Sequence, residues 1–237
     1  MTKVGVLLSG CGVQDGSEVY EAVLTILAIE KAGGQVVAIA PDVEQAEVIN
    51  HYTGEETRGE TRSVLAESAR IVRGKITSIK EVSAHDIDAL ILPGGFGAAK
   101  NLCNYATRGV DATVNPDVGR LILEINGLEK PIGAICIAPV VVALALRNRE
   151  NAPKPRLTIG EDGNTAEHLL QFGSEHVVTG LEEIAVDEAN HIVSTAAFML
   201  ASSAFEAEPG ITKLVNKVLA MARETAPRYR VRTCRKR

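Results

Sequence analysis

The chain has 237 residues, of which 46% are hydrophobic and 23% are charged, as in a globular protein with one sizeable core. Its formal charge is −5, and the body of the chain is more acidic still, because six basic residues and no acidic residue lie in 227–237. This acidity argues against nucleic-acid binding. Apolar runs are too short to span a bilayer, so we also expect no membrane partner.

The four cysteines show no paired spacing. They stand at Cys11, Cys103, Cys136 and Cys234, with no CxxC and no run of Cys and His ligands. The pattern therefore predicts neither a disulfide framework nor a metal site. Reduced thiols are typical of a cytoplasmic location, which we expect here.

The hydrophobic pattern alternates between strands and helices, which is typical of a parallel sheet with right-handed crossovers. It predicts strands at 3–8, 35–40, 75–79, 88–92, 131–135, 156–159, 176–178, 185–187 and 191–195. It predicts helices at 18–32, 61–73, 116–128, 139–146, 165–172 and 210–224. We predict one α/β domain over residues 1–226 and a flexible basic tail at 227–237.

Cys136 lies where a short buried strand ends and an apolar helix begins at Pro139. Such a turn exposes a side chain at the carboxyl edge of a parallel sheet, where open α/β folds keep their sites. The nearby helix N-terminus favours a thiolate, so Cys136 is a candidate nucleophile. The alternative is a buried, inert cysteine that packs like a small hydrophobe.

Three strand-to-loop turns are expected at the same edge of the sheet, namely 9–16, 93–97 and the turn at Cys136. Gly94 and Gly95 allow close approach of the backbone to a ligand. Their N–H groups, with that of Ile137, are candidates for holding an oxyanion. In the alternative interpretation, the glycines only permit a tight turn.

A thiolate nucleophile needs a proton partner, and two acids on the first predicted helix share a face, Glu18 and Glu21. Asp15 fits the N-cap of a capping box whose glutamate is Glu18, which gives Glu18 a structural role. Glu21 has no such role. A carboxyl buried at that position would have a raised pKa and would share a proton with sulfur.

Nucleotide binding is weakly indicated. The glycines at 10, 12 and 16 are spaced one residue too widely for the dinucleotide fingerprint, and no P-loop lysine follows them. We therefore expect no cofactor. Lys100 is a candidate for contact with a substrate carboxylate, although a solvated lysine is the simpler interpretation.

Three segments together, 6–18, 92–102 and Cys-Ile-Ala-Pro at 136–139, resemble the ElbB family of the PfpI/ThiJ superfamily. The resemblance covers the chain to about Glu224 and implies a flavodoxin-like, glutamine-amidotransferase-like fold, a three-layer sandwich with a cysteine nucleophile elbow. It also implies a homodimer. In the superfamily, a glutamate twelve residues before the glycine that closes the first helix touches the elbow cysteine. Counting back from Gly33 gives Glu21.

The activity that the resemblance implies is that of a cofactor-independent glyoxalase, which converts glyoxal or methylglyoxal to glycolate or lactate. Cys136 would add to the aldehyde as a hemithioacetal, Glu21 would move protons, and the N–H groups of Gly95 and Ile137 would hold the oxyanion. Many superfamily members carry a histidine in the loop that is here 158–163. That loop has none, which leaves open whether a histidine completes the site.

Two other functions remain open at the level of sequence. The missing histidine and the second thiol, Cys11, favour a redox-sensing or partner-binding protein whose cysteine is oxidised to sulfinate. A deglycase-type hydrolase would use the same residues as the glyoxalase. Glutaminase activity is disfavoured, because no histidine is followed by a glutamate two residues later.

Overall fold

A seven-stranded sheet forms the centre of the computed structural model, which describes the backbone of residues 1–234 and the side chains of residues 1–225. The strand order is β10-β11-β7-β6-β1-β2-β5, and every neighbouring pair is parallel except β10 with β11. These strands are β1 (Lys3–Leu7), β2 (Gln35–Ala40), β5 (Thr77–Ser78), β6 (Ala89–Leu92), β7 (Ile132–Ile135), β10 (Ala185–Asp187) and β11 (Ile192–Thr195). Two separate ribbons pair β3 (Ile49–Asn50) with β4 (Glu55–Glu56) and β8 (Arg156–Leu157) with β9 (Glu175–His176).

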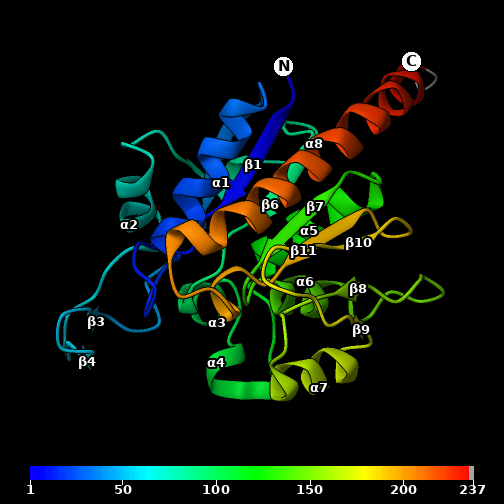
Figure 1. Ribbon diagram of the computed structural model, residues 1–237. Helices are drawn as coiled ribbons and strands as arrows, with labels where there is room; N and C mark the ends of the chain where they lie inside the picture. The colour runs from blue at the N-terminus through cyan, green and yellow to red at the C-terminus, as the bar shows by residue number, and fades with distance from the viewer. Residues whose placement is uncertain (235–237) are drawn as a thin grey trace.

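Helices cover both faces of the sheet. They are α1 (Val19–Lys31), α2 (Val64–Ile71), α3 (Phe96–Lys100), α4 (Tyr105–Arg108), α5 (Pro116–Gly127), α6 (Pro139–Leu146), α7 (Gly163–Gln171) and α8 (Ala204–Cys234), with short 3₁₀ turns at Ile79–Glu81, Gly109–Asp111 and Ala197–Met199. On one face α1 packs against α8, which also contacts β11, β7 and β6, while α5 and α6 pack on the other face. Figure 1 shows α8 crossing the sheet beside α1. The predicted three-layer, flavodoxin-like α/β fold is confirmed.

The core is built by the alternation of side chains along buried strands. In β6, Leu90 and Leu92 join the apolar cluster under α5 and α6, whereas Ile91 joins the cluster under α1 and α8. All three side chains are fully buried. A strand that is apolar at every position is expected for a parallel sheet covered on both faces, and it holds the carboxyl edge of the sheet in a fixed position.

The last helix is longer than the predicted 210–224. It begins at Ala204 and continues to Cys234, so its backbone passes through most of the segment expected as a separate tail. Gly210 lies inside this helix and is required there by packing, because a Cβ would lie 2.9 Å from the Thr195 hydroxyl and 3.0 Å from the Leu181 carbonyl. The division into a domain at 1–226 and a tail stays a prediction, and residues 235–237 lie outside the described residues.

A small hairpin lies between β2 and α2, where the sequence predicts neither strand nor helix until residue 61. It is formed by β3 and β4, and its backbone is tied to the rest of the molecule by Asp15, which accepts a hydrogen bond from the N–H of Ile49 at 2.7 Å. Across the described part of the chain, no helix combines the length and apolar character needed to cross a membrane.

Candidate active site

Cys136 occupies a strained turn between β7 and α6. Its φ is +59°, a left-handed conformation that is costly for a residue with a side chain and is often found at functional turns. Its N–H donates to the Thr195 carbonyl at 3.0 Å, which ties the turn to β11. The side chain is 8% exposed and reaches the wall of a cavity. The predicted nucleophile elbow is therefore present.

Glu21 is fully buried on the sheet side of α1 and touches Cys136. One carboxyl oxygen accepts the N–H of Gly94 at 2.8 Å, and the other accepts the N–H of Phe198 at 3.3 Å. Burial raises the pKa of Glu21 to about 8. At neutral pH the carboxyl is therefore mostly protonated and can donate a hydrogen bond to sulfur.

Cys136 and Glu21 form a coupled acid pair. Burial and the neighbouring Glu21 carboxyl raise the pKa of Cys136 above its ordinary range, and hydrogen bonds from the N–H groups of Gly95 and Ile137 oppose this shift. Two anions side by side in a dry site repel each other, so the pair loses its first proton well before its second. The state that combines a thiolate with a neutral carboxyl is the one suited to nucleophilic attack.

The glycine pair after β6 brings the backbone against this cysteine. A Cβ on Gly94 would lie 2.6 Å from the Cβ of Cys136 and 2.8 Å from a carboxyl oxygen of Glu21. Gly95 has a φ of +89°, and a Cβ there would lie 2.3 Å from the N of Glu18. Both positions therefore exclude any larger residue, and the glycines do more than permit a turn.

The amides of this loop have separate tasks. The N–H of Gly94, predicted to hold an oxyanion, is instead donated to Glu21, so Gly94 positions the carboxyl. The N–H groups of Gly95 and Ile137 point at the sulfur of Cys136. An oxygen developing on a carbon bonded to that sulfur would lie near these two amides, which keeps them as the candidate oxyanion donors.

Glu18 lies at the floor of the cavity and begins α1. It is 8% exposed, its carboxyl accepts the N–H of Glu21 at 2.7 Å, and burial raises its pKa. The predicted capping box with Asp15 as N-cap is therefore wrong, because the N-cap of α1 is Glu18. In the preceding loop, the N–H of Gly16 donates to the carbonyl of Gly12 at 2.7 Å. This closes the loop before the helix begins, and Asp15 does not cap the helix.

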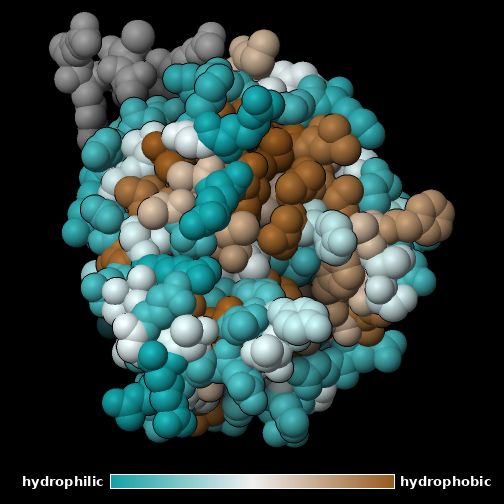
Figure 2. Space-filling model, turned by 90° about the vertical axis from the view of Figure 1, so that its left-hand side faces the viewer, coloured by the Kyte–Doolittle hydropathy of each residue, from teal (hydrophilic) through white to brown (hydrophobic). Residues whose placement is uncertain are grey.

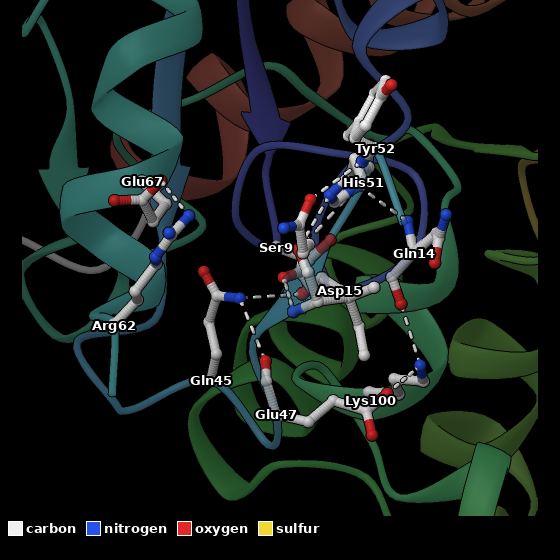
Figure 3. A network of polar contacts seen from close by, with 12 residues as sticks. Ser9, Gln14, Asp15, Gln45, Glu47, His51, Tyr52, Arg62, Glu67 and Lys100 are labelled. Carbon is white, nitrogen blue, oxygen red and sulfur yellow. Dashed lines mark hydrogen bonds and ion pairs between the residues drawn. The ribbon is translucent and has the colours of Figure 1, made fainter. Parts of the chain in front are cut away.

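Asp15 belongs to a polar network that holds the hairpin of β3 and β4 (Figure 3). Its carboxyl lies 3.8 Å from the Nε2 of His51, and that nitrogen accepts the N–H of Gln14 at 3.2 Å. Lys100 is held in the same network by an ion pair with Glu47 and by a hydrogen bond of 2.8 Å to the Gln14 carbonyl. Lys100 therefore anchors this loop and is not among the residues that line the cavity, so it is neither the candidate substrate contact nor a freely solvated lysine.

Cys11 stays outside the candidate site. It is half-buried in the first glycine-rich loop, paired in a short bridge with Ser17, and it is absent from the cavity wall. Burial, together with the charge of Glu67, raises the pKa of its thiol. Cys103 is more deeply buried, and burial raises its pKa to about 12. Among the described cysteines, Cys136 alone lines the cavity.

The cavity in front of Cys136 measures about 350 Å³. Its wall is formed by Val13, Glu18, Gly95, Phe96, Ala99, Tyr105, Ala106, Cys136, Ile137, Asp162, Thr165, Phe198 and Met199. Sequence reasoning missed the part of this wall contributed by Tyr105, Asp162, Thr165 and Phe198. These residues lie on short loops and helix ends, where no hydrophobic period marks a position.

A histidine is found next to the cavity but not in its wall. Of the residues that the structure describes, none of the cavity-lining ones is histidine. His168 on α7 shares a hydrogen bond of 2.7 Å between its Nδ1 and the hydroxyl of Tyr105, and Tyr105 does line the cavity. In the described chain no cluster of three or more His, Cys, Asp and Glu side chains is arranged to hold a metal ion.

A thiol on a strained strand-to-helix turn, a buried carboxyl against it and two amides aimed at its sulfur define a cysteine-centred α/β site. Residues 10–149 match the model of the DJ-1/PfpI family. The chain belongs to the DJ-1/PfpI family.

Relatives and solved structures agree with this assignment. The chain is 44% identical to the ES1 protein homolog, mitochondrial, of Rattus norvegicus, covering 92% of this chain and 84% of that protein. It is 43% identical to the human glutamine amidotransferase-like class 1 domain-containing protein 3, mitochondrial, covering 92% and 83%. A crystal structure of an isoprenoid biosynthesis protein with amidotransferase-like domain from Ehrlichia chaffeensis superposes with a TM-score of 0.85 at 33% identity, covering 93% and 99%.

These relatives correct one expectation. The rat and human proteins are named as mitochondrial, and so is the ES1 protein of Danio rerio, which is 28% identical over 84% of this chain and 77% of its own length. The names point to mitochondria and contradict the cytoplasmic location expected from the cysteines. Reduced thiols alone do not separate the two compartments.

Proposed function

We propose that the chain is a cofactor-independent glyoxalase of the ElbB type, which converts glyoxal or methylglyoxal and water to glycolate or lactate. The observation that carries this proposal is the fully buried Glu21 in contact with Cys136, at the wall of a cavity that can admit a carbonyl compound. The 33% identity to the Ehrlichia chaffeensis protein supports the ElbB assignment.

In the proposed reaction, the thiolate of Cys136 attacks the aldehyde carbon. A sulfur–carbon bond forms, and the carbonyl electron pair moves to oxygen, where the N–H groups of Gly95 and Ile137 stabilise the negative charge. The protonated Glu21 gives its proton to this oxygen and becomes a carboxylate, which can act as a base. Glu21 then takes the proton from the former aldehyde carbon and delivers one to the neighbouring carbon. This converts the hemithioacetal to a thioester of the 2-hydroxy acid.

Water completes the reaction by breaking the sulfur–carbon bond. The hydroxyl goes to the acyl carbon, the proton returns to the pair formed by Cys136 and Glu21, and the 2-hydroxy acid leaves. One carbon is oxidised and its neighbour is reduced within the same molecule. The balance therefore needs no external oxidant, reductant or cofactor.

The test is cofactor-free formation of lactate from methylglyoxal. We expect Cys136→Ala to abolish activity, because it removes the nucleophile. Cys103→Ala is the matched control, since it removes a buried thiol away from the cavity and should retain turnover. Lactate formation by Cys136→Ala at the parent's rate would refute the proposed nucleophile.

A redox-sensing role is the second candidate, favoured by the absence of histidine from the described cavity wall. Cys136 oxidised to sulfinate would be held by the amides of Gly95 and Ile137 and by the protonated Glu21. Mass spectrometry after mild peroxide treatment tests this role. If Cys136 gains no oxygen, the sensor role is removed. A deglycase-type hydrolase would use the same residues, and substrate profiling separates it from the glyoxalase.

We further propose a homodimer. Exposed apolar side chains lie on one side of α1, among them Val19, Tyr20, Val23 and Leu27. Figure 2 shows apolar side chains gathered on the face of the molecule that carries α1. Such a surface favours association with a partner. Light scattering coupled to gel filtration tests the proposal, and a monomer at micromolar concentration would refute it.

A further inference from the structure

The cavity is larger than the small aldehydes of the proposed reaction require. Its volume of about 350 Å³ lies in the range of roughly 300–1,000 Å³ that holds drug-sized ligands. Methylglyoxal placed at Cys136 would fill only a fraction of that space. The remaining space extends to a second wall, formed by the start of α4 and the start of α7.

The second wall carries an ordered set of polar groups. The Thr165 hydroxyl donates to the Asp162 carboxyl at 2.7 Å, and the Tyr105 hydroxyl shares its 2.7 Å hydrogen bond with His168. The Tyr105 ring also packs edge-on against His168 and Phe172, with centroids 5.6 and 6.2 Å apart. These contacts fix the three cavity-lining groups in place, so that they form a preorganised hydrogen-bonding surface.

The charged residues that line the cavity are all acidic. Glu18 and Asp162 are the charged residues in its wall, and both are acidic. Lys100 is engaged by Glu47 and the Gln14 carbonyl. The N-terminus of α7 does not offer a free anion site, because Asp162 is its N-cap and accepts the N–H of Asn164 at 3.2 Å. A carboxylate or phosphate in the ligand would therefore meet repulsion without a compensating cation.

Apolar side chains form another part of the cavity wall. Phe96, Ala99, Ile137, Phe198 and Met199 make up this apolar section. It suits a hydrocarbon segment of a ligand. The cavity thus combines a nucleophile, an apolar section and, on its second wall, an acidic hydrogen-bonding group.

We propose that the site takes carbonyl compounds that carry a primary ammonium group at the end remote from the carbonyl. The ammonium binds at Asp162 and Tyr105, the hydrocarbon segment lies in the apolar section, and the carbonyl reaches Cys136. An ammonium offers three N–H donors, which match the carboxyl and hydroxyl oxygens of the second wall. Only one part of this inference, the carbonyl group of the ligand, rests on the proposed function.

The test uses three unreactive ligands of equal length, pentylammonium, pentanol and pentanoate, with binding measured by calorimetry at low salt. For the parent we expect pentylammonium to bind about tenfold more tightly than pentanoate, with pentanol between them. Added salt should reduce this preference, because Asp162 is exposed at the mouth of the cavity. Protection of Cys136 against alkylation by iodoacetamide shows whether pentylammonium occupies this cavity.

Asp162→Asn should remove most of the preference while preserving the fold, because asparagine also serves as an N-cap. Glu161→Gln, a neighbour outside the cavity wall, should retain the parent's preference. Equal affinity for the three ligands, tighter binding of pentanoate, or binding that leaves Cys136 unprotected would overturn the inference. No turnover is involved, so a chain that prefers pentylammonium but makes no lactate would refute the glyoxalase and leave this binding preference standing.

Discussion

Replacing Glu21 by Gln should change how the stability of the folded chain depends on pH. Glutamine keeps the carbonyl that accepts the N–H of Gly94, and its amide can donate to the sulfur of Cys136 as the protonated carboxyl does. What it removes is the titration of a fully buried acid. It also loses the contact of the second carboxyl oxygen with the N–H of Phe198 at 3.3 Å, a loss that does not change with pH. The pH dependence of the difference between variant and parent therefore isolates the free energy of ionising that acid.

The size of the effect follows from the pKa of Glu21, which rises from 4.5 to about 8 on folding. The unfolded chain releases this proton at a lower pH than the folded chain, so stability is highest below the lower value and falls as pH rises through the higher one. Each pH unit between the two values costs about 1.4 kcal/mol, so the folded parent loses about 5 kcal/mol between pH 4.5 and pH 8.

Urea denaturation at pH 5, 7 and 9 measures the difference. We expect Glu21→Gln to gain stability relative to the parent by about 3 kcal/mol between pH 5 and pH 7, and more at pH 9. Glu30→Gln, an exposed substitution on the same helix, is the matched control and should follow the parent. If the parent and Glu21→Gln kept a constant difference across this range, the raised pKa and the buried proton would both be refuted.

Three other changes have definite expected results. Gly94→Ala places a Cβ 2.6 Å from the Cβ of Cys136, so it should cost about 1–3 kcal/mol in urea denaturation and abolish turnover; an active, equally stable variant would contradict the close approach. Asp15→Ala should remove the carboxyl that accepts the N–H of Ile49 and so loosen the hairpin of β3 and β4, which faster amide hydrogen exchange in the hairpin would show and unchanged exchange would contradict. The rate of lactate formation should rise with pH up to about 8, where Glu21 and Cys136 together lose their first proton, and a rate independent of pH between 6 and 9 would exclude this pair.

The strands and the position of Cys136 could be predicted because local pattern decides them. The strands β1, β2, β6 and β7 are recognised by their apolar runs. A parallel sheet is covered on both faces, so its strands need apolar side chains on both sides. Once the strands are known, the carboxyl edge of the sheet is known, and Cys136 lies on it. The close contact of Gly94 with Cys136 follows from the same edge.

The wrongly predicted capping box shows where local pattern fails. Asp15, followed by Glu18, matches a capping box, but the Asp15 carboxyl is used by the N–H of Ile49, far away in the sequence. A single sequence does not show this competing partner. The same holds for the hairpin, since its two-residue strands are held in place by the polar network in Figure 3.

The far wall of the cavity was also beyond prediction. Tyr105 and Asp162 lie on segments whose sequences fit several loop conformations, and only the packed structure brings them opposite Cys136. Phe198 follows β11 in a 3₁₀ turn, and its N–H donates to Glu21, which is 177 residues away in the sequence. Loop residues of this kind become visible as part of a site only after the sheet and helices have placed them.

The central claim is that Cys136 and Glu21 act as one catalytic unit, and a double-mutant comparison of lactate formation tests it most directly. The rates to compare are those of the parent, Cys136→Ala, Glu21→Gln and the double variant, all without added cofactor. If the two residues share one proton, the double variant is no slower than Cys136→Ala alone. The account would be contradicted if the rate loss of the double variant equalled the product of the losses of the two single variants. A Cys136→Ala variant that keeps the parent's rate would contradict it as well.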